Sequence, residues 1–305
     1  MSGPRHVVVV GRDAELWLTA TTLCEALGPT GVAMTAVELP SRLGPASVYA
    51  TLPAMEALHV RLGLDEAALL QATGGSFTLG YNVVSPGRPP FFLAHGVYGA
   101  PIDGGDFFPY WVKARRFGLD AQLEDFSPTA MAARHGRFLL PDESTELFGR
   151  TDYAYHLPAI PYAAMLKSRA QRLGVAMHQV VAVGIELDEG GRIRSLVSDG
   201  ALPIGGDLFV DASGSEAALI GQALGVATED WRSFFPFDRR LMGRAKPFAS
   251  VPSYAELRFS PASWTALYAT QAATSVTHSY RATEESDDAA IAAAAASSGL
   301  ALSDV

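Results

Sequence analysis

Residues 7–17 read VVVVGRDAELW, four valines followed by one glycine and the first residues of a mixed polar and apolar pattern. A continuous β-branched run is typical of a strand buried on both faces of a parallel sheet. Apolar residues then recur every three or four positions as far as Leu27, which predicts a helix that ends at Gly28-Pro29. A second apolar run over residues 32–37 ends in Glu38. This β–α–β pattern is most often half of a nucleotide-binding domain.

The turn after the first strand departs from the usual dinucleotide-binding pattern. That pattern places three glycines as G-x-G-x-x-G, whereas here only Gly11 is present and Asp13 and Leu16 hold the other two positions. A carboxylate at a helix N-terminus can accept the free N–H groups and repels a pyrophosphate, and Arg12 offsets part of that repulsion. We therefore expect weak or altered cofactor binding. Glu38 stands where an acidic residue would bond ribose hydroxyls, although a solvated carboxylate ending a strand explains it equally well.

The rest of the chain divides by composition. Residues 76–150 are dense in Gly, Pro and aromatic residues, which predicts strands and loops covering a binding cleft. Strands over residues 175–197 end at a turn marked by Asp199-Gly200, and residues 207–214 read DLFVDASG. A buried strand with this ending lets backbone approach a ligand closely, although a plain strand-to-helix turn uses the same residues. Residues 281–305 show no clear core face, so we expect a soft tail.

Composition excludes several classes of protein. The length of 305 residues suggests about two domains, and the net charge of -9 argues against nucleic-acid binding. Cys24 is the single cysteine and cannot form an internal disulfide. No apolar stretch approaches the ~20 residues of a membrane span, and the seven histidines lack metal-ligand spacing. We expect a cytoplasmic protein that has no metal site and binds neither membrane nor nucleic acid.

Several short motifs occur in a fixed order along the chain. They are VVVG followed by Trp17, TLP at 51–53, LGLDE at 62–66, ATG at 72–74, FTLG at 77–80 and DLFVDASG at 207–214. In type and order they resemble motifs of the flavin-dependent tryptophan halogenases, relatives of the single-component flavin hydroxylases. DLFVDASG is the most specific of these matches.

This resemblance implies an α/β fold, with a FAD/NAD(P)-binding Rossmann-like parallel sheet and an interleaved, partial substrate domain. Residues 1–74 and 152–228 would form the FAD-binding domain, and residues 75–151 and 229–305 an incomplete substrate side. The implied cofactor contacts are Gly11, Ala14, Glu38, Asp211 and Gly214.

The resemblance also implies a reaction and its participants. A flavin reductase supplies reduced FAD, and oxygen and halide then give hypohalous acid, which reaches a lysine beside a small aromatic substrate such as indole. That lysine belongs to F-K-L-G, and its position here is Thr78, which cannot form a haloamine. The family's W-x-W-x-I-P motif maps onto residues 264–269, where Trp264 alone is retained. The family's catalytic glutamate and late flavin-contacting segment are expected beyond residue 305.

Two classes of function stay open on these grounds. The first is a FAD-dependent halogenase or monooxygenase-type oxidoreductase acting on an indole or other aromatic substrate. The second is a degenerate, non-catalytic family member that acts as a binding protein, or a truncated remnant. In either case the expected substrate-side residues are Phe107, Phe108, Tyr110 and Trp111.

Overall fold

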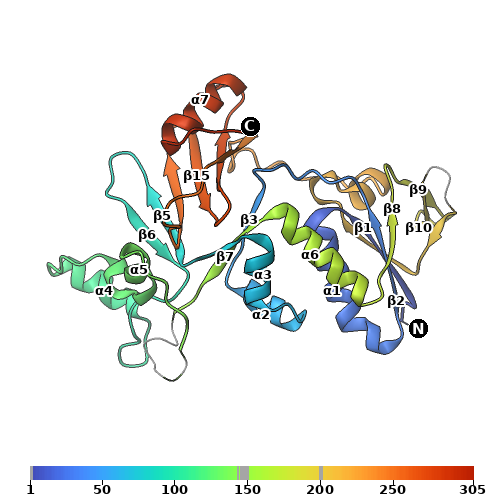
Figure 1. Cartoon of the computed structure of the whole chain (residues 1–305), viewed down its shortest axis with the longest axis horizontal. Helices are drawn as coiled ribbons and strands as arrows, with labels where there is room; N and C mark the ends of the chain where they lie inside the picture. The colour runs from blue at the N-terminus through green and yellow to red at the C-terminus, as the bar shows by residue number, and fades with distance from the viewer. Residues whose placement is uncertain (1–2, 143, 145–150, 199–201) are drawn as a thin grey trace. The chain divides into compact units, whose positions relative to one another are not determined.

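The computed structural model describes residues 3–142, 144, 151–198 and 202–305 (Figure 1). The chain divides into two compact units, Met1–Gly44 with Ala159–Trp231 (unit 1) and Pro45–Pro158 with Arg232–Val305 (unit 2). Residues 45–74, which the sequence assigned to the cofactor domain, thus belong to unit 2. The assignment of some segments to the cofactor and others to the substrate stays a prediction. The turn expected at Asp199-Gly200 lies outside the described residues.

Unit 1 is built on a four-stranded sheet in which every neighbouring pair is parallel. The strand order is β12-β1-β2-β8, with β12 at Leu208–Ala212, β1 at His6–Gly11, β2 at Ala33–Glu38 and β8 at Ala176–Gln179. All four valines of β1 are fully buried. The predicted Rossmann-like parallel sheet is therefore confirmed.

The two faces of this sheet are covered differently. Helices α1 (Asp13–Leu27) and α6 (Ala159–Arg172) pack side by side, and α1 also contacts β1 and β2 (Figure 1). A small antiparallel sheet covers the other face; its strands are β9 (Gly184–Leu187), β10 (Ile193–Val197) and β11 (Ile204–Gly205). Val8 and Val10 pack against this second sheet, because alternate residues of a strand point to opposite faces.

The segment after β12 is not a regular α-helix. A 3-10 turn over Gly214–Glu216 is followed by a π-helical segment over Ala218–Ala223. Ala217 between them is left-handed, with a φ of 45°. The carboxylate of Asp211 accepts N–H bonds from Leu219 and Ile220, which replaces the ordinary helical start.

Unit 2 contains two sheets. The six-stranded sheet pairs antiparallel throughout except between β14 and β5, which are parallel. Its order is β13 (Arg239–Ala245), β16 (Thr274–Tyr280), β15 (Ser263–Ala269), β14 (Ala255–Phe259), β5 (Gly80–Val84) and β6 (Phe91–Ala94). The second sheet is antiparallel, in the order β3 (Val48–Ala50), β7 (Ala154–Pro158) and β4 (Ser76–Thr78).

Residues 76–150 contain helices where the sequence suggested strands and loops only. Helix α4 spans Phe107–Arg116 and α5 spans Pro128–Arg134, with Leu123–Phe126 as a 3-10 turn between them. Three basic residues in the last turn of α4 suit the negative end of its dipole, a signal that the dense Gly and Pro around it obscured. The interpretation of residues 76–150 as strands and loops was therefore partly wrong.

Two helices, α2 (Ala54–Arg61) and α3 (Glu66–Thr73), follow β3 and contact β7. Aspartate before a helical pattern predicts an N-cap, and Asp65 caps α3, since its side chain accepts the N–H of Ala68 at 2.8 Å. Thr51 followed by Pro53 is a pattern typical of a helix cap and first turn, but the hydroxyl of Thr51 instead accepts the N–H of Tyr155 on β7. That hydroxyl therefore ties two segments together that are distant in sequence.

The C-terminal residues form an ordered helix rather than a soft tail. Helix α7 spans Asp287–Ser298, begins at the cap Ser286 and ends at the left-handed Gly299. Ala290 and Ala294 are buried, and Ala294 belongs to an apolar cluster with Leu267 of β15 and other residues. Small alanines suffice for this face because the helix lies close against the sheet.

Replacing Ser286 with alanine tests this cap. Its hydroxyl accepts the N–H of Ala289 at 3.3 Å, so Ser286→Ala should cost about 1 kcal/mol of unfolding free energy in unit 2. Urea denaturation of the variant and the parent measures the difference. A Ser297→Ala substitution in the same helix serves as control, and equal losses in both would contradict a capping role.

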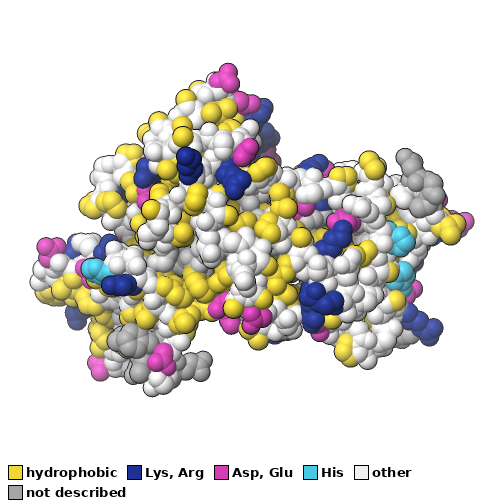
Figure 2. All heavy atoms as spheres, in the orientation of Figure 1, with side chains coloured by type: hydrophobic (Ala, Val, Ile, Leu, Met, Phe, Trp, Pro, Cys, Tyr) yellow, Lys and Arg dark blue, Asp and Glu magenta, His cyan; other side chains and the backbone are white. Residues whose placement is uncertain are grey.

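None of the described helices is long and apolar enough to span a membrane. On the face drawn in Figure 2, the Lys and Arg side chains lie interspersed with Asp and Glu side chains.

Candidate functional site

A cleft of about 440 Å³ lies in unit 1 at the carboxyl ends of β1, β2 and β12. Because β2 and β12 lie on opposite sides of β1, this is the point of a parallel sheet at which ligands bind. The lining residues are Arg12, Leu39, Pro40, Ser41, Arg42, Val181, Ala182, Val183, Ile185, Glu216, Ala218 and Gln222. They combine an apolar wall with two guanidinium groups and one carboxylate.

Gly11 ends β1 where the backbone of β12 comes closest. A Cβ atom at this position would lie 2.2 Å from the carbonyl oxygen of Ala212, its partner in the parallel ladder. The glycine of the predicted turn is therefore required by strand packing as well as by any approach of a ligand.

Asp13 is the first residue of α1 and is held in a left-handed backbone conformation with a φ of 54°. Its side chain is buried, and Oδ2 accepts the backbone N–H of Arg42 at 3.2 Å. The sequence suggested bonds to the N–H groups at the helix start, whereas this bond links the first turn to the loop after β2. Ala14 follows it, buried on the same helix.

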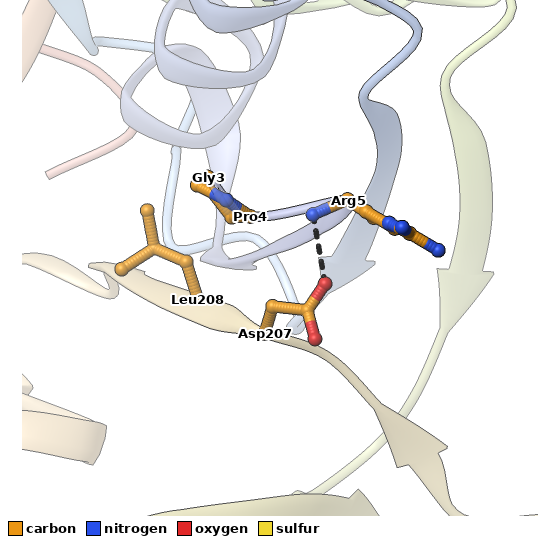
Figure 3. Close-up of a pocket in the computed structure, with 5 residues that line it drawn as sticks. All are labelled: Gly3, Pro4, Arg5, Asp207 and Leu208. Atoms are coloured by element: carbon orange, nitrogen blue, oxygen red, sulfur yellow. Dashed lines mark hydrogen bonds between the residues drawn. The ribbon is translucent and has the colours of Figure 1, made fainter. Parts of the chain in front are cut away.

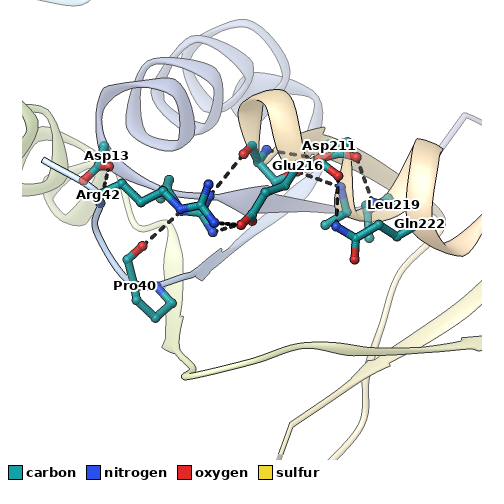
Figure 4. Close-up of polar contacts among 10 residues, drawn as sticks. Asp13, Pro40, Arg42, Asp211, Glu216, Leu219 and Gln222 are labelled. Atoms are coloured by element: carbon teal, nitrogen blue, oxygen red, sulfur yellow. Dashed lines mark hydrogen bonds and ion pairs between the residues drawn. The ribbon is translucent and has the colours of Figure 1, made fainter. Parts of the chain in front are cut away.

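An ion triad crosses the cleft (Figure 4). Glu216 Oε2 lies 2.6 Å from Arg12 Nη2, and Glu216 Oε1 pairs with Arg42 Nη2. Arg12 also donates from Nε to the carbonyl of Pro40 at 3.0 Å and from Nη1 to that of Ser213 at 3.3 Å. The Arg12 side chain is only 11% exposed and that of Arg42 is 61% exposed, so the first guanidinium is fixed and the second can move.

Glu38 lies at the end of β2, as predicted, and it has a protein partner. Its Oε2 atom lies 2.6 Å from Nζ of Lys167 on α6, and that ammonium also lies 5.3 Å from the ring centre of Trp17. The Glu38 side chain is 16% exposed, so the carboxylate sits in a partly desolvated ion pair. Its role as a ribose contact stays a prediction.

Asp211 and Gly214 lie in the turn after β12. Asp211 Oδ1 accepts the N–H and hydroxyl of Ser213, and Oδ2 accepts the N–H groups of Leu219 and Ile220. Burial raises the pKa of this carboxyl, but the hydrogen bonds together outweigh burial and leave the pKa below its usual value. Both oxygens are engaged, so Asp211 shapes the turn, and Gly214 supplies a left-handed residue with a φ of 73°. Direct cofactor contact by either residue stays a prediction.

A second hollow of about 470 Å³ lies at the opposite end of the sheet (Figure 3). Its walls are Gly3, Pro4, Arg5, Asp207 and Leu208. The Asp207 carboxylate accepts the backbone N–H groups of Arg5 and His6, and these bonds lower its pKa. Ligands bind such sheets at the carboxyl ends of the strands, and this hollow lies at the opposite ends. The Asp207 carboxylate therefore serves to hold the backbone at the start of β1.

Thr78 ends β4 in unit 2 and is buried. Its hydroxyl donates to the carbonyl of Gly80 at 3.1 Å and accepts the N–H of the same residue at 3.4 Å. Both hydrogen bonds of the Thr78 hydroxyl are therefore made with the backbone two residues away. Trp264 lies on β15 of the other sheet, where its ring stacks with Phe259 at 6.2 Å.

Three histidines of unit 2 are held neutral by burial. His156 on β7 has Nδ1 3.1 Å from the carbonyl oxygen of Ala269, and burial lowers its pKa to about 4 although this bond acts to raise it. Burial likewise lowers the pKa of His59 and His95 to about 4, the nearby Glu66 acting in the opposite direction on His59. The Nε2 atom of His95 is buried and has no hydrogen-bond partner among the described residues.

These histidines predict acid sensitivity of unit 2. Each pKa lies below the usual 6.5, so between about pH 6.5 and 4 the unfolded chain binds protons that the folded chain does not. The contribution of these three neutral histidines to the unfolding free energy should therefore be fully present above pH 6.5. It should fall as the pH drops from about 6.5 to 4. Urea midpoints measured across the range test this, and His156→Gln should reduce the dependence. Midpoints that rise or stay level on acidification would contradict the assignment.

The four predicted substrate-side aromatic residues all lie on α4. Phe107 packs against Phe126 with ring centres 4.9 Å apart, and Trp111 Nε1 donates to the carbonyl of Ala121. Phe108 stacks on Trp111 but is 54% exposed, and Tyr110 is 40% exposed. They form a partly exposed aromatic helix face, and their contact with a substrate stays a prediction.

A small hollow of about 50 Å³ in unit 2 lies beside β3 and the β15–β16 connection. Its lining includes Ser47, Val48, Arg244 and Ser275. The volume is far below the roughly 300 Å³ at which ligand pockets begin, so it holds no aromatic substrate by itself. Among the described residues, no three His, Cys, Asp or Glu side chains are grouped so that they could hold a metal ion.

Comparison with known proteins agrees with this architecture. The family model described as tryptophan halogenase matches residues 6–304. The chain belongs to the tryptophan halogenase family. The family resemblance found in the ordered sequence motifs is thus confirmed.

Two curated relatives are 28% and 29% identical to this chain over the aligned residues. It is 29% identical over 255 residues to the 7-chloro-L-tryptophan 6-halogenase KtzR of Kutzneria sp. (strain 744), covering 76% of this chain and 49% of the relative. It is 28% identical over 258 residues to the tryptophan 6-halogenase SttH of Streptomyces toxytricini, covering 77% and 49%. The chain spans about half the length of the curated relatives it matches.

Two solved structures of flavin-dependent halogenases are similar to this chain in fold. BrvH, a flavin-dependent halogenase from Brevundimonas sp. BAL3, matches with a TM-score of 0.88 and 29% identity over 95% of this chain and 59% of BrvH. Xcc4156, a flavin-dependent halogenase from Xanthomonas campestris, matches with a TM-score of 0.86 and 29% identity over 94% and 58%.

Sequence reasoning missed Arg42 and Glu216 as members of the cleft in this family member. Both follow the carboxyl end of a strand, four residues after Glu38 and two residues after Gly214 respectively. A search for opposite charges in loops that meet at one end of a parallel sheet would have paired them.

Proposed function

We propose that this chain carries the FAD-binding unit and part of the substrate unit of a flavin-dependent oxidoreductase that acts on an indole or another small aromatic substrate. The observation that carries the proposal is the cleft at the carboxyl ends of β1, β2 and β12. Family membership and the flavin-dependent halogenases among its structural neighbours support it.

The cleft residues match a dinucleotide in the type of donor that they offer. Gly11 is buried at the end of β1, next to the cleft residue Arg12, and it adds no side chain between the strand end and a ligand. Arg12 and Arg42 offer planar donors that match phosphate oxygens, and Glu38, which ends β2 next to the cleft residue Leu39, is proposed as the ribose contact. The apolar wall of Val181, Ala182 and Val183 suits the face of a nucleobase.

When bound, FAD would supply the redox and oxygen chemistry, with reduced FAD delivered by a separate flavin reductase. The chain's own residues would orient it: Arg12 and Arg42 at the phosphates, Glu38 at the ribose and Gly11 beneath the pyrophosphate. Asp13 adds a buried carboxylate at the start of α1, next to the place of the phosphates, so binding is proposed to be weak. A cytoplasmic location, where reductases and thiols operate, is part of the proposal.

Residue 78 sets a limit on the chemistry. A buried threonine hydroxyl bonded to Gly80 offers no amine, so the haloamine route implied by the family motif is not proposed for this residue. The substrate is proposed to be aromatic because the family's named relatives act on tryptophan or its chlorinated form. No residue of this chain is assigned as catalytic.

Binding and turnover are tested separately. Titration of FAD against the purified chain, followed by flavin fluorescence, should show saturable binding to unit 1. The chain is then supplied with a flavin reductase, NADH, oxygen, bromide and tryptophan or indole, and the products are examined by mass spectrometry. Brominated or hydroxylated product supports an oxidoreductase. Saturable binding without product leaves a FAD-binding protein, and absence of binding contradicts the proposal.

A further inference from the structure

The turn after β12 carries a carboxylate into the nucleotide cleft. Glu216 is the last residue of the 3-10 turn, and its side chain is 25% exposed. Its two oxygens divide between two cations, Oε2 on Arg12 and Oε1 on Arg42. The cleft therefore holds a bridging anion that belongs to the protein itself (Figure 4).

Besides the bond from Arg12 to the carbonyl of Ser213, the backbone beneath Glu216 is held by hydrogen bonds that lie outside this ion triad. Asp211 accepts four hydrogen bonds from the turn, and Ser213 Oγ accepts the N–H of Ala218 at 2.8 Å. Gln222 Nε2 donates to the carbonyl of Glu216 at 3.0 Å. The carboxylate is thus presented to the two guanidiniums by a preformed turn, at little cost in ordering its main chain.

The charges of the cleft and of the adjacent Asp13 balance without a ligand. Arg12 and Arg42 contribute two positive charges, and Glu216 with the neighbouring Asp13 contributes two negative charges. A pyrophosphate linkage brings two more negative charges and needs the same guanidinium donors that Glu216 holds. Arg12 also donates to two backbone carbonyl oxygens, which hold its guanidinium in place. It therefore cannot reorient to bind both Glu216 and a phosphate.

We propose that Glu216 competes with the pyrophosphate of the dinucleotide for Arg12 and Arg42, so that binding requires its carboxylate to leave the two guanidiniums. The inference rests on the proposed function, because it takes the same cleft as the dinucleotide site. The exposed Arg42 side chain is the half of the triad that opens, and the fixed Arg12 is the half that stays to receive a phosphate oxygen.

Calorimetric titration of FAD and of ADP into wild type and Glu216→Gln tests the competition. The glutamine keeps the size of the side chain and removes its charge, so both ligands should bind the variant about tenfold more tightly. The gain should shrink as salt is raised, and Arg42→Gln in the Glu216→Gln background should remove it. Glu25→Gln breaks a comparable ion pair with Arg169 in the same unit and should leave affinity unchanged.

The outcomes separate this inference from the proposed function. Equal or weaker binding of both ligands by Glu216→Gln, with FAD still bound by wild type, overturns the competition and leaves FAD binding standing. Tighter ADP binding by the variant without FAD binding by either protein supports the competition and overturns the FAD proposal. Absence of both ligands from both proteins overturns both. Thermal melting curves confirm that each variant is folded, and a ligand-induced rise in Tm gives a second measure of affinity.

Discussion

Asp13→Gly is expected to tighten FAD binding about tenfold. The substitution removes a buried carboxylate from the first turn of α1, where the positive end of the helix dipole favours a phosphate. Two unit charges about 4 Å apart repel by roughly 4 kcal/mol at an effective dielectric of 20, and screening in the open cleft reduces this toward the ~1.4 kcal/mol of a tenfold change. Glycine also accepts the positive φ of residue 13 without strain. Quenching of flavin fluorescence measures the affinity.

Asp13→Asn separates charge from backbone strain. Asparagine tolerates a left-handed conformation and keeps an oxygen for the N–H of Arg42. If repulsion between the Asp13 carboxylate and the phosphates weakens binding, Asp13→Asn should give most of the increase in FAD affinity expected for Asp13→Gly. Affinity that is unchanged or weaker in both variants would refute a repulsive role for Asp13.

Gly11→Ala is expected to destabilise unit 1 by about 3 kcal/mol, and the central sheet should lose protection first. The added Cβ would stand 2.2 Å from the carbonyl oxygen of Ala212 and 2.8 Å from its Cβ. A flexible side chain could move aside, but here the obstacle is the backbone of a neighbouring strand in register with β1. Amide hydrogen exchange read by mass spectrometry over β1, β2 and β12 localises the loss.

Gly205→Ala provides the matched control within the same unit. A Cβ at residue 205 would meet only the carbonyl oxygen of Arg194 at 3.9 Å, an ordinary contact. The control should therefore change hydrogen exchange and melting temperature little. If Gly11→Ala behaves like Gly205→Ala, the close approach of β1 and β12 is not as tight as the structure describes.

Local patterns were sufficient to predict much of unit 1. The valine run, the helical spacing after Gly11 and the second apolar run appear as β1, α1 and β2, because burial on both faces and helical periodicity leave a direct mark on residue type. The capping role of Asp65 was equally local. Patterns failed where a partner distant in sequence decides the outcome, as for Thr51, whose hydroxyl bonds β7, and for α7, whose alanines match the sheet beneath them.

The sequence by itself determined the family, the parallel sheet and the glycine at its central turn, since each is written in contiguous residues or in motifs of fixed order. Only the tertiary structure decided what surrounds that turn. Arg12, Arg42 and Glu216 come from three loops separated by up to 204 residues, and they meet because parallel strands bring their carboxyl ends to one edge. The residues of an ion pair recur with no fixed spacing in the sequence, and any Lys or Arg can pair with any Asp or Glu. Contiguous residues therefore do not predict which charges will pair.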